Sequence, residues 1–268
     1  MNVIVSGAAG RMGQAIVGCL LAEAVPGLRL AGALDAAGSP ALGSDAGRLA
    51  GGRETGVMIT ADPQELPPAD VLIDFSVAQA APALAAYVTA QGLGWVLGTT
   101  GLSPEALDAV QQAAGKVPVV MAPNMSLGVN LLLKLVEDAA RALKDRGYDV
   151  EIVERHHRRK KDAPSGTALG LGEAVARGLD CDLAQVARHG RQGLATGDRP
   201  AQEIGFHAVR AGDFVGDHTV LFATDGESVE LSHRATSRDT FAIGALRAAA
   251  WLEGRAPGLY RMRDVLGV

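Results

Sequence analysis

The chain has 268 residues, 48% of them hydrophobic, and a net charge of −5, which is the composition of a globular protein and not of a disordered one. It holds no apolar run near the roughly 20 residues of a membrane span, and no basic segment precedes its first apolar run, so we expect neither a membrane protein nor a signal peptide. The two cysteines, Cys19 and Cys181, match neither a disulfide framework nor metal-ligand spacing, which favours a reducing, cytoplasmic setting and predicts no metal site.

Strands and helices alternate along the first half of the chain. Short apolar runs predict strands over 2–6, 28–34, 71–75, 95–97 and 117–121. Helical spacing follows the first strand to about residue 25, Ser76 is placed to cap a helix ending near Gln91, and Ser103-Pro104-Glu105 is a helix start. Residues 36–56 are the least structured part. This alternation predicts an α/β fold with a Rossmann-type, doubly wound parallel sheet.

The pattern changes after residue 126. We expect a long helix over 127–145, a strand over 148–155 and a helix from Ser165 to about 178. Strand-like runs at 203–210, 214–223 and 227–235 are joined by short turns without helices, and an amphipathic helix covers 239–254. The last helix could return to the first domain, a dinucleotide-binding domain which would then comprise 1–126 plus 237–268, and residues 127–236 should form an α+β domain with a mixed or antiparallel sheet.

A glycine-rich turn follows the first strand. It is Gly7-Ala8-Ala9-Gly10-Arg11-Met12-Gly13, a Gly-x-x-Gly-x-x-Gly variant of the dinucleotide fingerprint, with a helix after it. In that geometry the helix amides face a phosphate. Asp35 ends the second strand, where a ribose-binding acid is expected. A tight structural turn that binds nothing is the alternative.

Asp35 also bears on the choice of cofactor. A carboxylate accepts hydrogen bonds from the ribose hydroxyls of NAD and repels the 2′-phosphate of NADP. Ala36 and Ala37 follow it, so no cation is present there to hold that phosphate, although Arg11 could reach it from the glycine loop. The sequence favours NADH over NADPH.

A cationic segment is the most informative stretch of the second domain. Residues 155–161 hold five Arg or Lys and two His, directly before the helix start at Ser165. In an acidic protein this clustering indicates a site for a small anion, and imidazoles can move protons near neutral pH. A solvated basic surface is the alternative.

Together these motifs resemble the 4-hydroxy-tetrahydrodipicolinate reductase (dihydrodipicolinate reductase) family of lysine and diaminopimelate biosynthesis. The most specific motif runs from His156-His157 through Lys160 to Asp162-Ala163-Pro164-Ser165-Gly166-Thr167. The resemblance extends to five further segments: the glycine loop, Gly98-Thr99-Thr100-Gly101, Asn124-Met125-Ser126, Gly216-Asp217-His218-Thr219-Val220 and Ser237-Arg238.

The resemblance implies NAD(P)H-dependent reduction of a ring dicarboxylate, 4-hydroxy-tetrahydrodipicolinate, with loss of water, by a homotetramer assembled through the central sheets. It implies His156 as the proton donor, Lys160 as a second donor, and His157, Gly166 and Thr167 as substrate contacts. The implied cofactor contacts are Gly7, Ala8, Ala9, Gly10, Arg11, Met12, Asp35, Gly98, Thr99, Thr100, Ala122, Pro123, Asn124 and Met125. Ala36 departs from those relatives that carry arginine there, which weakens the case for NADPH.

The implied substrate makes sense of the loop composition. Ser165 would cap a helix whose first amides, at Gly166 and Thr167, can bind a carboxylate. Adjacent His156 and His157 would point to opposite sides of an extended chain, so position alone does not decide which is the acid. The four other histidines, His189, His207, His218 and His233, are interpreted as structural or surface residues.

Two other functions remain open. One is a different two-domain dehydrogenase of the aspartate pathway, although nothing in such an enzyme calls for the 156–167 text. The other is a regulator that binds nucleic acid through 155–161. The chain is acidic and no aromatic residues interleave with these cations, so we expect no nucleic-acid partner. Motifs of serine hydrolases and zinc enzymes are absent from the sequence.

Overall fold

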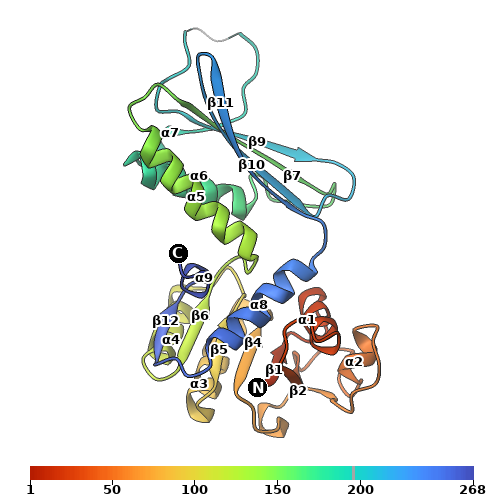
Figure 1. Cartoon of the computed structure of the whole chain (residues 1–268). Helices are drawn as coiled ribbons and strands as arrows, with labels where there is room; N and C mark the ends of the chain where they lie inside the picture. Colours follow the sequence, from red (N-terminus) through yellow and green to blue (C-terminus); the bar gives the residue numbers. More distant parts are fainter. Residues whose placement is uncertain (195–196) are drawn as a thin grey trace. The chain divides into compact units, whose positions relative to one another are not determined.

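The computed structural model describes residues 1–194 and 197–268. The chain forms two compact units (Figure 1). Unit 1 comprises Met1–Leu127 and Arg238–Gly267, and unit 2 comprises Gly128–Ser237 and Val268. Unit 1 is thus assembled from both ends of the chain.

Unit 1 is built on a seven-stranded sheet in which all neighbouring strands run parallel. The strand order is β12-β6-β5-β4-β1-β2-β3. The strands are β1 (Asn2–Ser6), β2 (Arg29–Leu34), β3 (Ile59–Thr60), β4 (Val71–Asp74), β5 (Gly94–Leu97), β6 (Pro118–Met121) and β12 (Gly258–Tyr260). The chain leaves β1 toward β2 and β3, then returns to the other side of β1 through β4. This reversal makes the β1–β4 boundary the switch point at which such sheets bind ligands.

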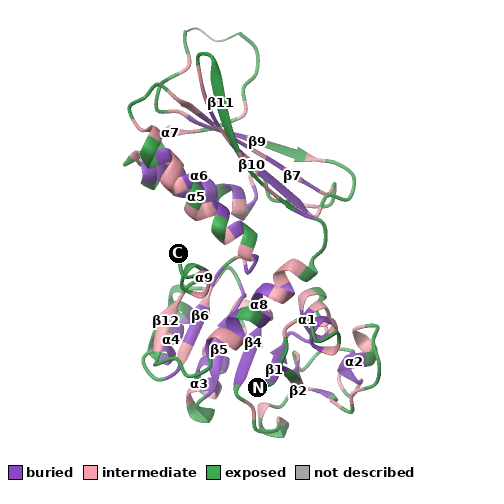
Figure 2. Cartoon of the chain, viewed as in Figure 1, coloured by how far each residue is buried: buried purple, intermediate pink, exposed green. Residues whose placement is uncertain are grey.

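Helices cover both faces of this sheet. They are α1 (Arg11–Leu21), α2 (Ala46–Leu49), α3 (Ala81–Gln91), α4 (Pro104–Ala114), α8 (Asp239–Trp251) and α9 (Met262–Leu266), with 3-10 turns at Pro63–Glu65 and Ala78–Ala80. Val3 and Val5 pack on the side of α1 and α8, whereas Ile4 packs on the side of α3 and α4. The central strands β4 and β5 are buried on both faces (Figure 2), as parallel strands of a doubly wound fold are. The predicted Rossmann-type sheet is confirmed.

Unit 2 contains a five-stranded mixed sheet in the order β11-β10-β7-β9-β8. Its strands are β7 (Asp149–His156), β8 (Ala187–His189), β9 (Ile204–Arg210), β10 (Gly216–Thr224) and β11 (Glu227–Ala235), and its helices are α5 (Leu127–Leu143), α6 (Gly166–Leu179) and α7 (Leu183–Val186). The pairs β7–β9 and β8–β9 are parallel, and β7–β10 and β10–β11 are antiparallel. The predicted mixed sheet is confirmed.

Helices α5 and α6 pack on one face of the unit 2 sheet (Figure 1). Burial therefore alternates along β7: Val150, Ile152, Glu154 and His156 are buried, and the residues between them are partly exposed. Because successive strand side chains point to opposite faces, Glu154 and His156 share the helix-covered face. Two polar side chains are thus buried where an apolar core residue would be ordinary.

One local expectation was wrong. Ser76 caps no helix: its amide donates to Asp74 Oδ1 at 2.8 Å, a 3-10 turn follows, and α3 begins only at Ala81. The Asx-type hydrogen bond explains this, since it holds the segment in a turn. Residues 36–56, expected to be the least structured part of the amino-terminal half, form turns and the short helix α2, which Asp45 caps by accepting from the Arg48 amide.

Candidate active site

The glycine loop between β1 and α1 is shaped by close backbone packing. Gly7 has φ +74°, and a Cβ there would lie 2.6 Å from the carbonyl oxygen of Phe75. A Cβ on Gly13 would lie 2.2 Å from the carbonyl oxygen of Gly7. Gly10 is the N-cap residue of α1 and provides no capping side chain. The first turn of α1 therefore keeps amides that the helix itself does not use, which is the geometry that binds phosphate.

Asp35 ties the end of β2 to this loop. Its Oδ2 accepts from the Ala9 amide at 2.6 Å and its Oδ1 accepts from the Ala36 amide at 2.7 Å. Each carboxylate oxygen has a second lone pair, so both can still accept from a ribose hydroxyl. Ala36 is exposed beside the carboxylate.

A cavity of about 460 Å³ opens at this place in unit 1. The predicted residues Gly7, Gly10 and Asp35 line it together. Sequence analysis missed the segment after β4, Phe75-Ser76-Val77, which also lines it. The order of the sheet is the signal that could have found this segment, because β4 lies beside β1 at the switch point.

The other predicted cofactor segments also follow parallel strands. Gly98 to Thr100 comes after β5, and Ala122 to Met125 comes after β6. Carboxyl ends of parallel strands meet at one edge of a sheet, so the structure brings these segments to the edge that carries the glycine loop. A Cβ on Gly98 would lie 2.4 Å from the Phe75 ring, and a Cβ on Gly244 would lie 1.8 Å from the Met125 carbonyl oxygen. Both segments are thus closely packed.

Asp74, at the end of β4, is fully buried beneath this edge. Burial raises the pKa of its carboxyl group, against the hydrogen bond from the Ser76 amide, which lowers it. The carboxyl group therefore favours the neutral form more than an exposed aspartate does, which limits its repulsion of a nearby phosphate.

In unit 2, His156 lies at the end of β7 and is 7% exposed. Its Nδ1 is 2.5 Å from Oε2 of Glu154, which is 1% exposed. Arg210 donates to both oxygens of Glu154, at 2.7 Å each, and the Ser165 amide donates to Oε1 at 3.0 Å. Burial would raise the pKa of Glu154, but the hydrogen bonds from His156, Arg210 and Ser165 outweigh it and lower the pKa to about 2. We call Glu154, His156, His218 and Arg210 the His156 cluster.

His218 of β10 completes this cluster. Its ring meets the His156 ring edge-on, with centroids 5.1 Å apart, and its Nε2 lies 3.1 Å from Ser165 Oγ. Burial, followed by the charge of His156, lowers the pKa of His218 to about 3. Sequence analysis did not connect His218, Glu154 or Arg210 with His156. Glu154 had a signal, since it precedes His156 by two residues in a strand.

The cationic segment leaves β7 as a turn. Lys160 Nζ lies 2.9 Å from Asp162 Oδ2, so this lysine is paired with an acid as well as surrounded by cations. Arg158, Arg159 and Lys161 are exposed. The amide of His157 donates to the Phe214 carbonyl at 2.8 Å, which anchors the turn to the β9–β10 connection.

Gly166 and Thr167 are the first two residues of α6. Ser165 is its N-cap, and Ser165 Oγ accepts from the Ala168 amide at 3.1 Å, as predicted. Gly166 is exposed, and a Cβ built on it would touch nothing within 4 Å. The unit 2 residues predicted for the substrate thus lie at one end of β7 and at the start of α6, which the Glu154–Ser165 hydrogen bond joins.

Comparison with known proteins decides the family. A family profile described as "Dihydrodipicolinate reductase, N-terminus" matches residues 1–125, and one described as "Dihydrodipicolinate reductase, C-terminus" matches residues 128–266. The chain belongs to the dihydrodipicolinate reductase family. The resemblance predicted from the sequence is confirmed.

Relatives in this family are similar over their whole length. A 4-hydroxy-tetrahydrodipicolinate reductase from Anaeromyxobacter dehalogenans (strain 2CP-C) is 53% identical, with 100% of this chain and 98% of the relative covered. One from Thiobacillus denitrificans is also 53% identical, with 100% and 99% covered. The chain is therefore an oxidoreductase of this family, which acts in lysine and diaminopimelate biosynthesis with a nicotinamide cofactor.

A solved structure supports the fold. Dipicolinate-bound dihydrodipicolinate reductase from Paenisporosarcina sp. TG-14 superposes with a TM-score of 0.77 at 23% identity, covering 98% of each chain. A probable dehydrogenase from Thermotoga maritima has a TM-score of 0.60 at 9% identity, covering 99% of this chain and 92% of that one.

Proposed function

We propose that the chain reduces 4-hydroxy-tetrahydrodipicolinate to tetrahydrodipicolinate with NADH as the favoured donor and His156 as the proton donor. The hydrogen bond between His156 Nδ1 and the buried Glu154 carries the assignment of the acid. It leaves Nε2 as the ring nitrogen that can give a proton to a substrate. This contact supports His156 over His157 as the acid, between which position in the sequence did not decide.

The neighbouring groups suit a ring with two carboxylates. Lys160 adds a mobile ammonium, which would bind a carboxylate and act as a second proton donor. Gly166 and Thr167 would bind the other carboxylate at the start of α6, where the helix dipole favours negative charge. His157 would complete the substrate contacts. The related Paenisporosarcina reductase is dipicolinate-bound, and dipicolinate is likewise a ring with two carboxylates.

The cavity in unit 1 would hold the dinucleotide. The uncapped start of α1 would hold the pyrophosphate, and Asp35 would accept from the ribose hydroxyls. Contacts would come from Gly7 through Met12, Gly98 through Thr100 and Ala122 through Met125. When bound, the reduced nicotinamide supplies the hydride. Exposed Ala36 offers no charge to a 2′-phosphate, which supports NADH over NADPH.

The partners follow the family resemblance. We propose a cytoplasmic homotetramer that forms through the sheets of unit 2, with a small dicarboxylate as the substrate and no nucleic-acid partner. β11 supports this assembly, because it is an edge strand with a largely exposed surface. Within residues 1–194 and 197–268, no helix combines the length and apolar character that crossing a bilayer requires.

The test is a coupled assay in which dihydrodipicolinate synthase supplies the substrate and the absorbance of the reduced cofactor is followed. We expect turnover with both cofactors and a higher kcat/KM with NADH. If neither cofactor supports turnover, the proposed reaction is wrong. A higher kcat/KM with NADPH would contradict the cofactor preference alone.

A further inference from the structure

We propose that Glu154, held by Arg210, is a positioning residue for His156: it fixes one ring proton on Nδ1 and so reserves Nε2 for proton transfer. The proposal rests on the proposed role of His156 as the acid and explains how that histidine is held in the tautomer that can donate a proton from Nε2. It concerns residues that would touch neither the substrate nor the cofactor.

The Glu154 carboxylate is fixed in place by four donors. Oε2 accepts from His156 Nδ1 at 2.5 Å and from Arg210 Nη1 at 2.7 Å. Oε1 accepts from the Ser165 amide at 3.0 Å and from Arg210 Nη2 at 2.7 Å. A carboxylate has about four lone-pair sites, so these bonds use all of them. With its side chain 1% exposed, Glu154 has no room to rotate without breaking several at once.

This arrangement determines the His156 tautomer. The low pKa of Glu154 keeps it ionised across the neutral range, and an ionised carboxylate can only accept hydrogen bonds. His156 Nδ1 must therefore carry the hydrogen in both charge states of the ring. The proton that His156 gains and loses is then always the one on Nε2.

His218 does not compete for this role. Its Nε2 is bonded to Ser165 Oγ, and burial keeps the ring neutral at physiological pH. The positive charge of Arg210 offsets the charge of Glu154, so the pair orients His156 without leaving a net charge buried beside it. Other charged groups near the cluster are Lys160 with Asp162, Asp217 with Arg234, and His233 on β11.

Gly216 borders the other side of the ring. A Cβ there would lie 3.1 Å from His156 Nε2, closer than nearly all real contacts of this type. The absence of a side chain at 216 therefore leaves space next to the nitrogen that Glu154 reserves. Glu154 thus bonds to Nδ1, and Gly216 leaves space beside Nε2 on the other side of the ring.

The direct test is the ¹⁵N NMR spectrum of the histidine rings in the full-length protein, with His156 assigned through His156→Gln. We expect neutral His156 to carry its proton on Nδ1 in the wild type. In Glu154→Gln the ring should lose this preference and populate both tautomers. Neutral wild-type His156 with its proton on Nε2 would overturn the proposal without reference to any activity.

The kinetic test compares Glu154→Gln with Glu151→Gln. Both carboxylates lie on β7 and bond to a histidine and to arginine, but Glu151 lies on the opposite face. Glu154→Gln should lower kcat about 10- to 100-fold, as loss of an orienting partner does, with KM for NADH unchanged. The substitution also removes a negative charge 2.5 Å from the ring, so the pH–rate profile of Glu154→Gln should differ from that of the wild type. Glu151→Gln should leave the profile in place.

The outcomes separate the two claims. If His156→Gln keeps full activity, the proposed acid is wrong. If His156→Gln is inactive but Glu154→Gln keeps the wild-type rate and profile, the positioning role alone is wrong. Should Glu154→Gln fail to fold, Gly216→Ala and the wild-type NMR spectrum decide: we expect Gly216→Ala to lower kcat with the Nδ1 proton retained, and an unchanged kcat would count against the proposal.

Discussion

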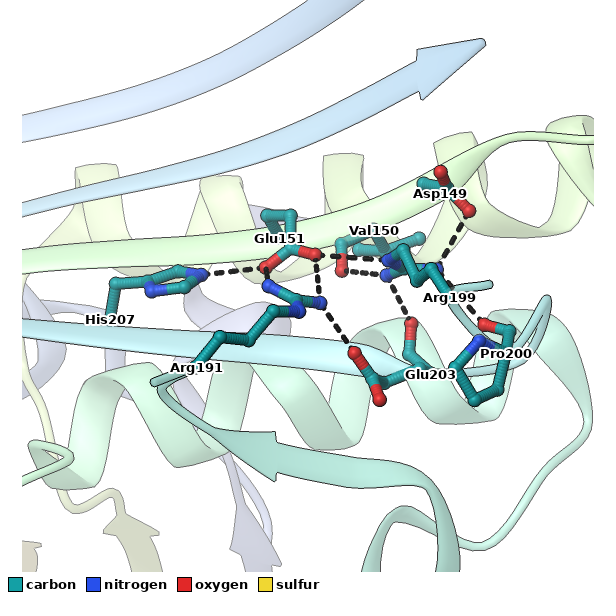
Figure 3. A network of polar contacts seen from close by, with 8 residues as sticks. All are labelled: Asp149, Val150, Glu151, Arg191, Arg199, Pro200, Glu203 and His207. Carbon is teal, nitrogen blue, oxygen red and sulfur yellow. Dashed lines mark hydrogen bonds and ion pairs between the residues drawn. The ribbon is translucent and has the colours of Figure 1, made fainter. Parts of the chain in front are cut away.

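The carboxylate of Glu151 occupies the space that a side chain on Gly205 would need, since a Cβ there would lie 1.7 Å from Oε2. Figure 3 shows the network of hydrogen bonds and ion pairs around Glu151, for which the absence of a side chain at Gly205 leaves room. Arg191 donates to both oxygens of Glu151, at 3.0 and 2.6 Å, and His207 Nε2 lies 2.7 Å from Oε2. Arg199 adds a bond from Nε at 3.1 Å. The network holds both ends of the segment between Arg191 and Arg199 against β7.

Replacing Gly205 by alanine should disrupt this network. The added methyl group displaces the carboxylate, and we expect the free energy of unfolding to fall by about 1–3 kcal/mol, as is usual when a polar network is broken. Gly170→Ala in α6 is the control, because the nearest atom to its Cβ is 3.8 Å away. Urea denaturation of both variants checks this, and equal stability of Gly205→Ala and wild type would show that Glu151 repacks freely.

Gly7→Ala should weaken dinucleotide binding through steric contact with the Phe75 carbonyl. Gly43 is a matched control, since it also has φ +74° but has no atom within 4 Å of a Cβ. Both variants bear the left-handed backbone cost of about 1–2 kcal/mol. Only Gly7→Ala should also raise the Kd of NADH, by about tenfold or more, since tenfold corresponds to 1.4 kcal/mol. Calorimetric titration with NADH measures this, and equal Kd values for the two variants would remove the loop from the cofactor site.

Lys160→Ala should lower both the rate and the affinity for the dicarboxylate. Loss of a charge-assisted hydrogen bond of about 1.5–3 kcal/mol predicts a roughly 10- to 100-fold increase in KM for the substrate. Lys161→Ala removes the same charge from an exposed neighbour and should change KM little. Steady-state kinetics with saturating NADH make the comparison. Equal effects of the two substitutions would mean that the segment acts only through its overall field.

Ala36→Arg should shift the cofactor preference toward NADPH. Ala36 is exposed directly after Asp35, and a guanidinium there can bind a 2′-phosphate that the carboxylate repels. We expect the ratio of kcat/KM for NADPH to that for NADH to rise by about tenfold or more. An unchanged ratio would place the ribose away from Asp35.

His218 predicts a loss of stability in mild acid. Its pKa is about 3 in the folded chain and 6.5 ordinarily, so the unfolded chain binds the proton first. Stability is therefore complete above pH 6.5 and falls toward pH 3, by up to about 1.4 kcal/mol per pH unit. His233, whose pKa burial also lowers, acts in the same direction, whereas Glu154 contributes only as the pH falls through the acid range toward about 2.

Urea denaturation at pH 7 and pH 5 tests this. The difference between the two free energies of unfolding should shrink by roughly 2 kcal/mol in His218→Asn, which follows from the same slope over the interval below pH 6.5. His189→Asn, at an exposed position, should retain the wild-type difference. Identical pH dependence in His218→Asn and wild type would show that His218 is protonated in the folded state.

The parallel sheet was predictable because its strands are short apolar runs bounded by turn residues, as Val71 to Ile73 illustrates. The glycine loop and the Ser165 cap were predictable for a similar reason: each depends on residues next to one another in the chain. Ser76 misled because its amide bonds locally to Asp74, an interaction that competes with helix capping. β12 and α9 were missed because such short elements carry little periodicity.

The full His156 cluster could not be predicted, because some of its members are far apart in the sequence. Glu154 and His156 are neighbours on one strand, but His218 joins them only through the β7–β10 register, which pairs it with Glu154. Arg210 reaches the same carboxylate from the end of β9. Both contacts depend on strand pairing across more than 50 residues, and no local pattern in the sequence specifies that pairing.

Unit 2 lies between the two segments of unit 1 in the sequence, and this order affects how the chain folds during synthesis. Helix α8 packs on β4 and β5 with Ala242 and Leu246 buried, and β12 pairs with β6, so these late residues complete the core that begins at Val3. A nascent chain released only as far as residue 237 would present β6 as an open edge and leave uncovered the part of the sheet face that α8 covers beside α1. Exposed edges and apolar faces invite aggregation. Newly made chains therefore need the segment that begins at Arg238 to cover the surfaces through which they would otherwise self-associate.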